Sequence, residues 1–391
     1  MLKLLRLYLN RYLYTKKTII VLIVLILITN LCIFYSYSNN KLTKREQKFV
    51  YKDFKGDPYV DLGKPCNLEQ FFHRRLPNKT FDNVSLPPMP TQRRYLIYTC
   101  RGYCGGLGDQ IKAVTASYAI AKRSGRELRI QETIPCGITT YLRPKMYDWT
   151  YDEREIQELN FTFCNTNDVR KTRNKQLYEY LLYLNDTVIF LRSNRRYRNI
   201  DEEYRNILRA NYNELFDLKP EIKRELNEFK GRYVQENKTV CAHLRVGNNP
   251  GFMDSRYNNL GNLSEIWEFL SKYDSNGHVI YIATDSNAVR EAARRRFLDR
   301  YIDMPGPVVN TAFKFDDDSC SVFRKIFLDF TFLTTCDVLL LTFSGFGEHA
   351  SLLRTKEGNQ YCFQNGKVYP CPIYSIISNR SVKELNPLLD M

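Results

Sequence analysis

Two kinds of hydrophobic pattern occur along the chain: one long uncharged run near the amino terminus, and shorter runs that alternate with amphipathic segments further on. The long run, Thr18 to Phe34, is mostly Ile, Leu and Val and contains no charged residue. At ~1.5 Å per residue, a helix of this length just spans a thin bilayer. Basic but no acidic residues precede it, which by the positive-inside rule keeps that end in the cytosol. We therefore predict a cytosolic tail at 1–17 and a transmembrane signal-anchor at 18–36.

The alternative for this run is a cleaved signal peptide. The run is long for the hydrophobic region of a signal peptide, and Ser36-Tyr37-Ser38 is a poor match to a cleavage site. A short span fits the thinner membranes of the early secretory pathway better than the plasma membrane. The sequence therefore favours a single-pass type II topology, with the part of the chain beyond the anchor in the lumen of the secretory pathway.

Beyond the anchor, residues 37–90 have the composition of a stem that ends in the proline-rich run 86–90. A strand pattern, a glycine-rich loop, a helical spacing and a second strand pattern then follow, at 94–99, 101–108, 109–124 and 127–130. This order predicts a βαβ unit whose first turn is rich in glycine.

The middle of the chain, 150–235, is charged, and we expect it to be mostly helical, at 153–158, 174–184 and 201–230. A second alternating block follows, with strand patterns at 239–244, 278–283 and 338–343 and helical patterns at 286–299 and 320–334. Alternation of this kind is typical of an α/β fold with a parallel sheet and helices on both faces. We predict two Rossmann-like domains that face each other across a cleft, an N-terminal domain at 91–235 and a C-terminal domain at 236–391.

Composition indicates the compartment. Of the 11 cysteines, one lies in the membrane run and ten, an even number, lie beyond it, as expected for a disulfide-bonded lumenal part. Cys100–Cys104 and Cys362–Cys371 are close enough in sequence to be local ends of bridges. Glycosylation sequons occur only beyond the anchor, at Asn78, Asn83, Asn160, Asn185, Asn237, Asn262 and Asn379. The net charge of +15 suits an anionic ligand, and nucleic acid is not an expected partner in this compartment.

The candidate chemistry lies where strands of the second block end. His243-Leu244-Arg245-Val246-Gly247 ends the first of them. Arg245 carries a permanent charge and can bind two phosphate oxygens at once, so we expect it to stabilise a diphosphate leaving group. The alternative is an arginine paired with a carboxylate at a domain interface. His243 is expected to bind a base, a phosphate or a backbone carbonyl, and Gly247 opens the loop.

The other two strand ends carry polar and glycine residues. Thr284 or Asp285 is predicted to cap the helix that follows, and Asp285 is also a candidate acceptor for donors of a ribose or base. Ser344, Gly345 and Phe346 form a turn before a helix expected to begin near Glu348. Ser344 is a candidate phosphate contact there, because backbone N–H groups at a helix start bind anions. Phe346 either stacks on a base or packs in the core.

The first block has its own glycine-rich loop. Gly106 and Gly108 allow a ligand to approach the backbone closely. Asp109 is expected either to cap the helix or to accept the proton of an acceptor hydroxyl. Asp316-Asp317-Asp318 offers an alternative chemistry, a metal-dependent transferase that holds a divalent cation on a sugar diphosphate, but no strand precedes these acids at the usual distance.

In this order, these motifs resemble the fucosyltransferase superfamily that includes α1,2-, α1,6- and protein O-fucosyltransferases. The resemblance covers about residues 94–355 and rests on the glycine loop at 105–110, the HxRxG sequence at 243–247 and the tail from Asp329 to Phe346. It implies a GT-B fold with an acceptor-side domain at 91–235 and a donor-binding domain at 236–391. It also implies GDP-fucose as donor, and inversion with no required metal or other cofactor. It also implies that Arg245 holds the pyrophosphate, and that His243, Asp329, Ser344 and Phe346 line the donor pocket.

The sequence departs from that family at two points. Protein O-fucosyltransferases often carry Asn where this chain has Asp109, and α1,6-enzymes have a second arginine where Val246 stands. We expect a Golgi fucosyltransferase that acts on a glycan or glycoprotein hydroxyl. An inactive carbohydrate-binding relative is the alternative from another class. A cell-surface adhesion ectodomain is disfavoured, because β-sandwiches have no use for glycine loops at strand ends. The acceptor is not identified by any residue pattern.

Overall fold

The computed structural model describes residues 64–65, 92–100, 105–132, 136–157, 159–165, 180–182, 184–193, 202–247, 263–308, 319–356 and 358–371. The predicted tail, signal-anchor and most of the stem lie outside these ranges. Within them, no helix is both long and apolar enough to cross a bilayer. Residues 62–391 form one compact unit, to which all described residues belong.

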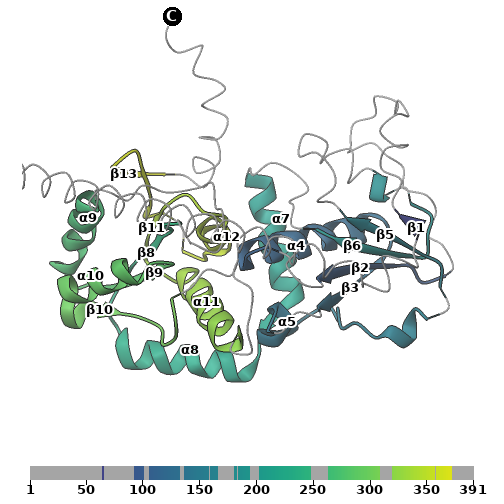
Figure 1. Cartoon of the computed structure of the whole chain (residues 1–391), viewed down its shortest axis with the longest axis horizontal. Coiled ribbons are helices and arrows are strands. Elements are labelled where there is room, and N and C mark those ends of the chain that lie inside the picture. The colour runs from purple at the N-terminus through teal and green to yellow at the C-terminus, as the bar shows by residue number, and fades with distance from the viewer. Residues whose placement is uncertain are drawn as a thin grey trace, which may run out of the picture. The chain divides into compact units, whose positions relative to one another are not determined.

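One sheet of this unit has five parallel strands (Figure 1). In spatial order they are β1 (Lys64–Pro65), β5 (Phe161–Asn165), β6 (Val188–Arg192), β2 (Tyr95–Cys100) and β3 (Glu127–Glu132). Helix α4 (Leu107–Arg123) connects β2 to β3, so the predicted βαβ unit is confirmed. Its apolar residues pack in one core with Leu96, Tyr98 and Ile130 of the sheet.

The middle of the chain is less helical than expected. The prediction missed β5 and β6, two short strands that charged segments surround. Both are rich in aromatic and β-branched residues, which favour strands. Four of the five residues of β6 are buried, and in β5 buried and half-buried residues alternate. The long helix expected at 201–230 is instead two helices, α7 (Glu202–Leu215) and α8 (Pro220–Tyr233), separated by β7 (Phe216–Leu218). Pro220 starts the second helix because proline lacks the N–H that a helix interior needs.

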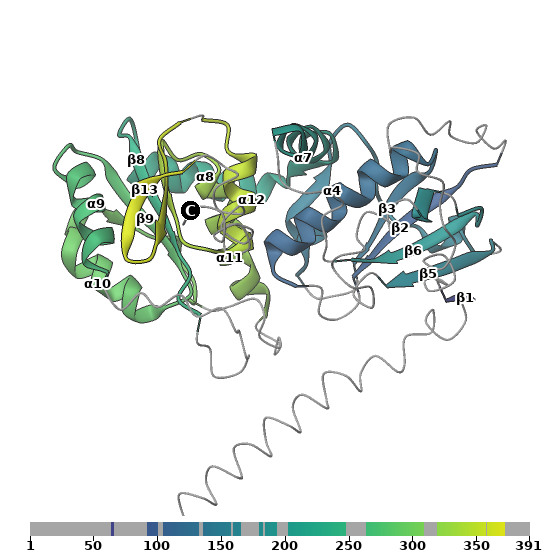
Figure 2. The ribbon, with the colours of Figure 1, turned by 90° about the horizontal axis from the view of Figure 1, so that it is seen from above.

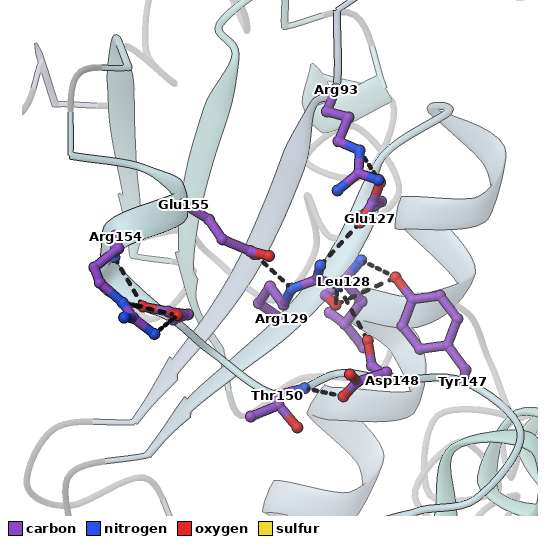
Figure 3. A network of polar contacts seen from close by, with 10 residues as sticks. Arg93, Glu127, Leu128, Arg129, Tyr147, Asp148, Thr150, Arg154 and Glu155 are labelled. Carbon is purple, nitrogen blue, oxygen red and sulfur yellow. Dashed lines mark hydrogen bonds and ion pairs between the residues drawn. The ribbon is translucent and has the colours of Figure 1, made fainter.

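The outer edge of β3 is covered rather than exposed. The segment at 147–150 runs beside it, where Ile130 N–H donates to the Trp149 carbonyl and Leu128 N–H to the Tyr147 hydroxyl. Arg129 crosses the same edge and binds Glu127 at 2.9 Å and Glu155 at 3.2 Å (Figure 3). Charged side chains and a covering segment prevent an edge strand from pairing with another chain.

A second sheet contains six strands, in the order β10 (Tyr301–Ile302), β9 (Val279–Thr284), β8 (Thr239–Leu244), β11 (Val338–Leu341), β12 (Gln360–Gln364) and β13 (Lys367–Pro370). All are parallel except β13, which forms an antiparallel hairpin with β12. Alternate residues of each strand face opposite sides. One side packs on α9 (Ser264–Asp274) and α10 (Asn287–Phe297), and the other on α8 and α11 (Ser319–Leu333). The predicted α/β fold with parallel sheets is confirmed.

One hydrophobic core includes residues of both sheets and of α4, α5 (Ile138–Tyr141), α8 and α11, whereas α9 and α10 pack on the second sheet in a separate core. Tyr141 in α5 stacks on Phe323 and Phe327 of α11, and its hydroxyl donates to the Cys320 carbonyl at 3.0 Å. A disulfide joins Cys136 to Cys320 beside this stack. Helix α12 (Gly345–Leu353) packs on α4 and α7, as Figure 2 shows from above. The division at residue 235 stays a prediction.

Two more disulfides have both cysteines among the described residues, and they join Cys241 to Cys336 and Cys362 to Cys371. The second of these is the local bridge that the sequence predicted, and it closes the β12–β13 hairpin. Cys104 lies outside the described residues.

Candidate functional site

The loop after β8 is fixed by two polar side chains from neighbouring strands. Thr342 follows β11, the strand that pairs with β8, and Leu341 lies opposite His243 in the register. The Thr342 hydroxyl accepts from Arg245 N–H at 2.8 Å and donates to the His243 carbonyl at 3.0 Å. These bonds turn the chain at Arg245 and leave its side chain at the carboxyl edge of the sheet. The sequence analysis gave Thr342 no role, because its contacts depend on the register of strands about 100 residues apart.

Asp285, which follows β9, binds the same loop from the other side. One carboxylate oxygen accepts from Val246 N–H at 2.7 Å. The other accepts from Gly247 N–H at 3.1 Å and from the Arg245 guanidinium at 2.5 Å. Gly247 has a φ of +78°, a left-handed backbone conformation that is strained for a residue with a side chain. The Asp285 side chain is 8% exposed and that of Arg245 is 17% exposed, so the pair is largely shielded from solvent.

This arrangement gives Asp285 a structural task that the sequence analysis did not foresee. The predicted cap at Thr284 or Asp285 is wrong, because Ser286 caps α10 and its hydroxyl accepts from Val289 N–H. The Asp285 carboxylate is therefore available to orient Arg245. A contact between Asp285 and a ribose or base stays a prediction.

His243 lies beneath this loop and is uncharged. Its side chain is buried, and burial, together with the nearby Arg245 charge, lowers the pKa of His243 to about 3. The ring lies 5.0 Å from that of Phe346, and its Nδ1 atom has no hydrogen-bond partner. A Cβ atom on Gly347 would come within 2.6 Å of that Nδ1, so the glycine permits α12 to approach the imidazole. A direct role of His243 toward a donor stays a prediction.

Helix α12 begins at the same edge, at Gly345, three residues before the start that the sequence suggested. Ser344 is its N-cap, and its hydroxyl accepts from Phe346 N–H at 3.3 Å. Phe346 packs against His243 and against Phe330, at 5.3 Å between ring centroids, so its contacts in the chain are those of a core residue. The first turn of α12 thus starts three residues after Thr342, which binds the Arg245 backbone.

The glycine-rich turn of the first sheet meets this helix start. A Cβ atom on Gly108 would lie 2.7 Å from the Gly345 carbonyl oxygen, so the two backbones are in direct contact. Gly106 is the N-cap of α4, so the prediction that Asp109 caps this helix is wrong. Asp109 is the third residue of α4, is 39% exposed at its side chain and forms an ion pair with Lys112. The predicted glycine motifs of the two blocks therefore come together, and Asp109 is the residue that follows Gly108.

Asp329 has a different environment. Its carboxylate accepts from the Tyr281 hydroxyl at 2.5 Å and from Lys325 at 2.9 Å, inside a buried network that continues to Asp303. Burial raises the pKa of Asp329, against the opposing effect of the Lys325 charge. Its bonds therefore fix α11 to β9, and a role in a donor pocket stays a prediction.

Several predicted features lie outside the described residues. They are Asp316-Asp317-Asp318 and the sequons at Asn78, Asn83, Asn262 and Asn379. Asn160, Asn185 and Asn237 are described and exposed, as glycosylation requires. In the part of the chain that the structure covers, no group of three or more His, Cys, Asp or Glu side chains is placed to hold a metal ion.

Comparison with known proteins gives similarity in structure only. No protein-family model matches the sequence, and no curated protein matches it. The chain is similar to the fucosyltransferase NodZ from Bradyrhizobium, with 15% identity over 72% of this chain and 100% of that chain and a TM-score of 0.49. NodZ alpha-1,6-fucosyltransferase soaked with GDP-fucose gives 14% identity over the same shares and the same TM-score. A variant of Arabidopsis thaliana FUT1 in complex with GDP gives 10% identity over 71% of this chain and 72% of that chain, with a TM-score of 0.45.

Proposed function

We propose that this chain is a GT-B glycosyltransferase that transfers fucose from GDP-fucose to a hydroxyl of a glycan or glycoprotein, with inversion at the anomeric carbon. The observation that carries the proposal is the position of Arg245. Its guanidinium is held by Asp285 at the carboxyl edge of a parallel sheet, and its backbone is bound to Thr342, next to the amino terminus of α12. This edge is where open α/β sheets bind phosphorylated ligands.

The site supplies positive charge without a metal. The Arg245 guanidinium provides N–H donors in a planar fork, and the first turn of α12 provides backbone N–H groups at the positive end of a helix dipole. As the bond between fucose and the diphosphate breaks, its electron pair moves to the diphosphate oxygen. Both groups bind that growing negative charge more tightly than the ground state, which lowers the barrier.

The acceptor hydroxyl attacks the anomeric carbon from the opposite side, through an oxocarbenium-like transition state. The new bond forms from the acceptor oxygen, GDP departs, and the hydroxyl proton has to be taken up. We assign that proton to Asp109, because it directly follows Gly108, which contacts Gly345, and because its carboxylate is partly exposed. The ion pair with Lys112 orients this carboxylate.

The compartment in this proposal is the Golgi lumen, with a type II signal-anchor in the membrane. Three disulfides and three exposed sequons among the described residues support an oxidising, glycosylating compartment. A mass decrease on treatment with an N-glycosidase, together with Golgi staining of the expressed chain, is the expected result. An unglycosylated chain in the cytosol would contradict this part of the proposal.

The donor is tested with the purified full-length chain, by titration calorimetry against GDP-fucose, GDP-mannose and UDP-sugars, each with EDTA. Selective binding of GDP-fucose in EDTA is expected, and Arg245→Ala is expected to abolish it. Arg295→Ala is the matched control, because it removes an exposed arginine from α10, a helix that packs on the same sheet. A loss of binding in EDTA would favour the metal-dependent alternative. Binding without turnover of any acceptor would favour the inactive relative.

A further inference from the structure

A groove runs between α9 and the β12–β13 hairpin, outside the site described above. Figures 1 and 2 both show β13 beside α9. The groove has a volume of about 440 Å³ and is partly open to solvent. Three aromatic side chains and several polar ones line it, chiefly Phe269, Tyr273, Tyr361, Glu265, Glu268 and Lys272.

We propose that this groove binds the distal sugar units of an oligosaccharide acceptor, a role that rests on the proposed function of the Arg245 site. Its floor is aromatic. The Phe269 ring lies 4.7 Å from that of Tyr361 and 5.2 Å from that of Tyr273, tilted by 58° and 59°. Flat apolar rings of this kind contact the C–H faces of pyranoses. The two tyrosines add hydroxyl groups, which serve as donors or acceptors.

The Tyr273 hydroxyl on this floor stays neutral at physiological pH. Burial and a hydrogen bond to the Tyr361 hydroxyl raise the pKa of Tyr273 to about 12. A neutral phenol both donates and accepts, which matches the hydroxyl groups of a sugar.

The rim of the groove carries charges of both signs. Glu265 lies three residues before Glu268 and four before Phe269, and Lys272 lies four residues after Glu268. Carboxylate and ammonium groups form strong hydrogen bonds with sugar hydroxyls. A purely apolar ligand would leave these charges desolvated without partners. A neutral polyhydroxylated ligand with apolar faces satisfies both the floor and the rim.

The direction of α9 connects the groove with the Arg245 edge. The helix returns the chain from the end of β8 to the start of β9, so it runs opposite to the strands. Its Glu265 end therefore lies toward the carboxyl edge, where Arg245 and Asp285 are, and its Tyr273 end toward the amino edge. With 11 residues, α9 is about 16 Å long, enough for more than one sugar unit. The groove is suited to an extended oligosaccharide whose far end lies away from the reacting hydroxyl.

The test measures binding of oligosaccharides to the full-length chain by saturation-transfer NMR and titration. The probes are N-acetylglucosamine, galactose and mannose oligomers of one to six units. At least one series is expected to bind, with affinity that rises with length. Tyr361→Ala is expected to weaken that binding about tenfold, and Glu268→Gln about fivefold. Tyr233→Ala is the matched control, because this exposed tyrosine lies on α8 outside the groove.

Hydrolysis of GDP-fucose by the same variants separates the two proposals. The groove variants should hydrolyse the donor at the wild-type rate, which also shows that they fold. If the wild type hydrolyses no donor, the proposed function fails, and oligosaccharide binding still decides the groove. The inference is overturned if no series binds, if binding is the same in Tyr361→Ala and Glu268→Gln as in the wild type, or if only a Lys/Arg-rich peptide binds, with salt-dependent affinity.

Discussion

Replacing Asp285 with asparagine should weaken diphosphate binding although Asp285 itself need not contact the ligand. In the wild type, one carboxylate oxygen accepts from Val246 N–H, and the other from Gly247 N–H and Arg245. Asparagine retains one acceptor and presents an NH₂ group where the other oxygen was. One side of the loop then faces a donor instead of an acceptor, and Arg245 loses the negative charge of its partner.

The expected magnitude follows from burial and bond type. Asp285 is 8% exposed and Arg245 17% exposed, so solvent screens their interaction little. Hydrogen bonds to charged groups contribute roughly 1.5–3 kcal/mol each, and removal of one partner of a shielded pair costs about 2–5 kcal/mol. If about 2–4 kcal/mol of this affects the position of Arg245, kcat/KM for donor hydrolysis should fall roughly 30- to 1000-fold.

The assay compares GDP with inorganic pyrophosphate, by calorimetry, for the wild type, Asp285→Asn and the control Asp299→Asn, which changes an exposed aspartate near α10. If Asp285 acts through Arg245, both ligands lose affinity in the same proportion. If Asp285 binds a ribose or base, only GDP loses affinity. The double variant Arg245→Ala/Asp285→Asn should be no weaker than Arg245→Ala alone. Retention of wild-type affinity for both ligands in Asp285→Asn would refute the reasoning.

Two further predictions concern stability. Gly108→Ala places a Cβ 2.7 Å from a backbone oxygen of α12 and should lower the free energy of unfolding by about 1–3 kcal/mol. Gly231→Ala on α8, where an added Cβ would meet no atom within 4 Å, should raise the free energy of unfolding by about 0.5–1 kcal/mol. Equal urea midpoints for the two variants would contradict the close contact at Gly108. The pKa of His243 is about 3 in the folded chain and near 6.5 when unfolded, so the stability that its neutral form contributes is present above pH ~6.5 and declines toward pH 3, by up to about 1.4 kcal/mol per unit. Urea unfolding between pH 7 and 5 should therefore show a smaller pH dependence in His243→Gln than in the wild type, and identical slopes would show that His243 takes up a proton in the folded state.

The strands of the second sheet were predictable because they are continuous apolar runs. The expected strands at 239–244, 278–283 and 338–343 differ from β8, β9 and β11 by no more than two residues at either end. A buried parallel strand needs such a run on both faces, and little else in the chain imitates it. The strands β5 and β6 were missed because each has only five residues within charged surroundings.

Helix starts were less predictable than strands. Sequence spacing favoured Asp109 and Asp285 as caps, but Gly106 and Ser286 take those positions. The reason for Asp285 is long-range: its partners Arg245, Val246 and Gly247 are about 40 residues away in sequence, and the pairing of β8 with β9 brings them together. A cap preference worth about 1 kcal/mol does not outweigh three bonds to one carboxylate.

The same limit applies to Asp329. Its place in the tail motif suggested a pocket residue, whereas its carboxylate binds Lys325 one turn away and Tyr281 on β9. Local spacing reveals the Lys325–Asp329 pair, four residues apart on one helix, but not the tyrosine that completes its bonds. The site residues that the sequence did bring together correctly, Arg245 and the two glycine-rich turns, are those at strand ends, where topology fixes the position of a residue.

The central claim is that Arg245 binds the diphosphate of GDP-fucose and stabilises its departure. The most direct test is the rate at which the full-length chain releases free fucose from GDP-fucose in EDTA, followed by NMR, for the wild type, Arg245→Ala and Arg295→Ala. The account predicts a rate that EDTA leaves unchanged, that falls about 10²- to 10³-fold in Arg245→Ala and that is retained in Arg295→Ala. Equal rates for the wild type and Arg245→Ala would contradict it.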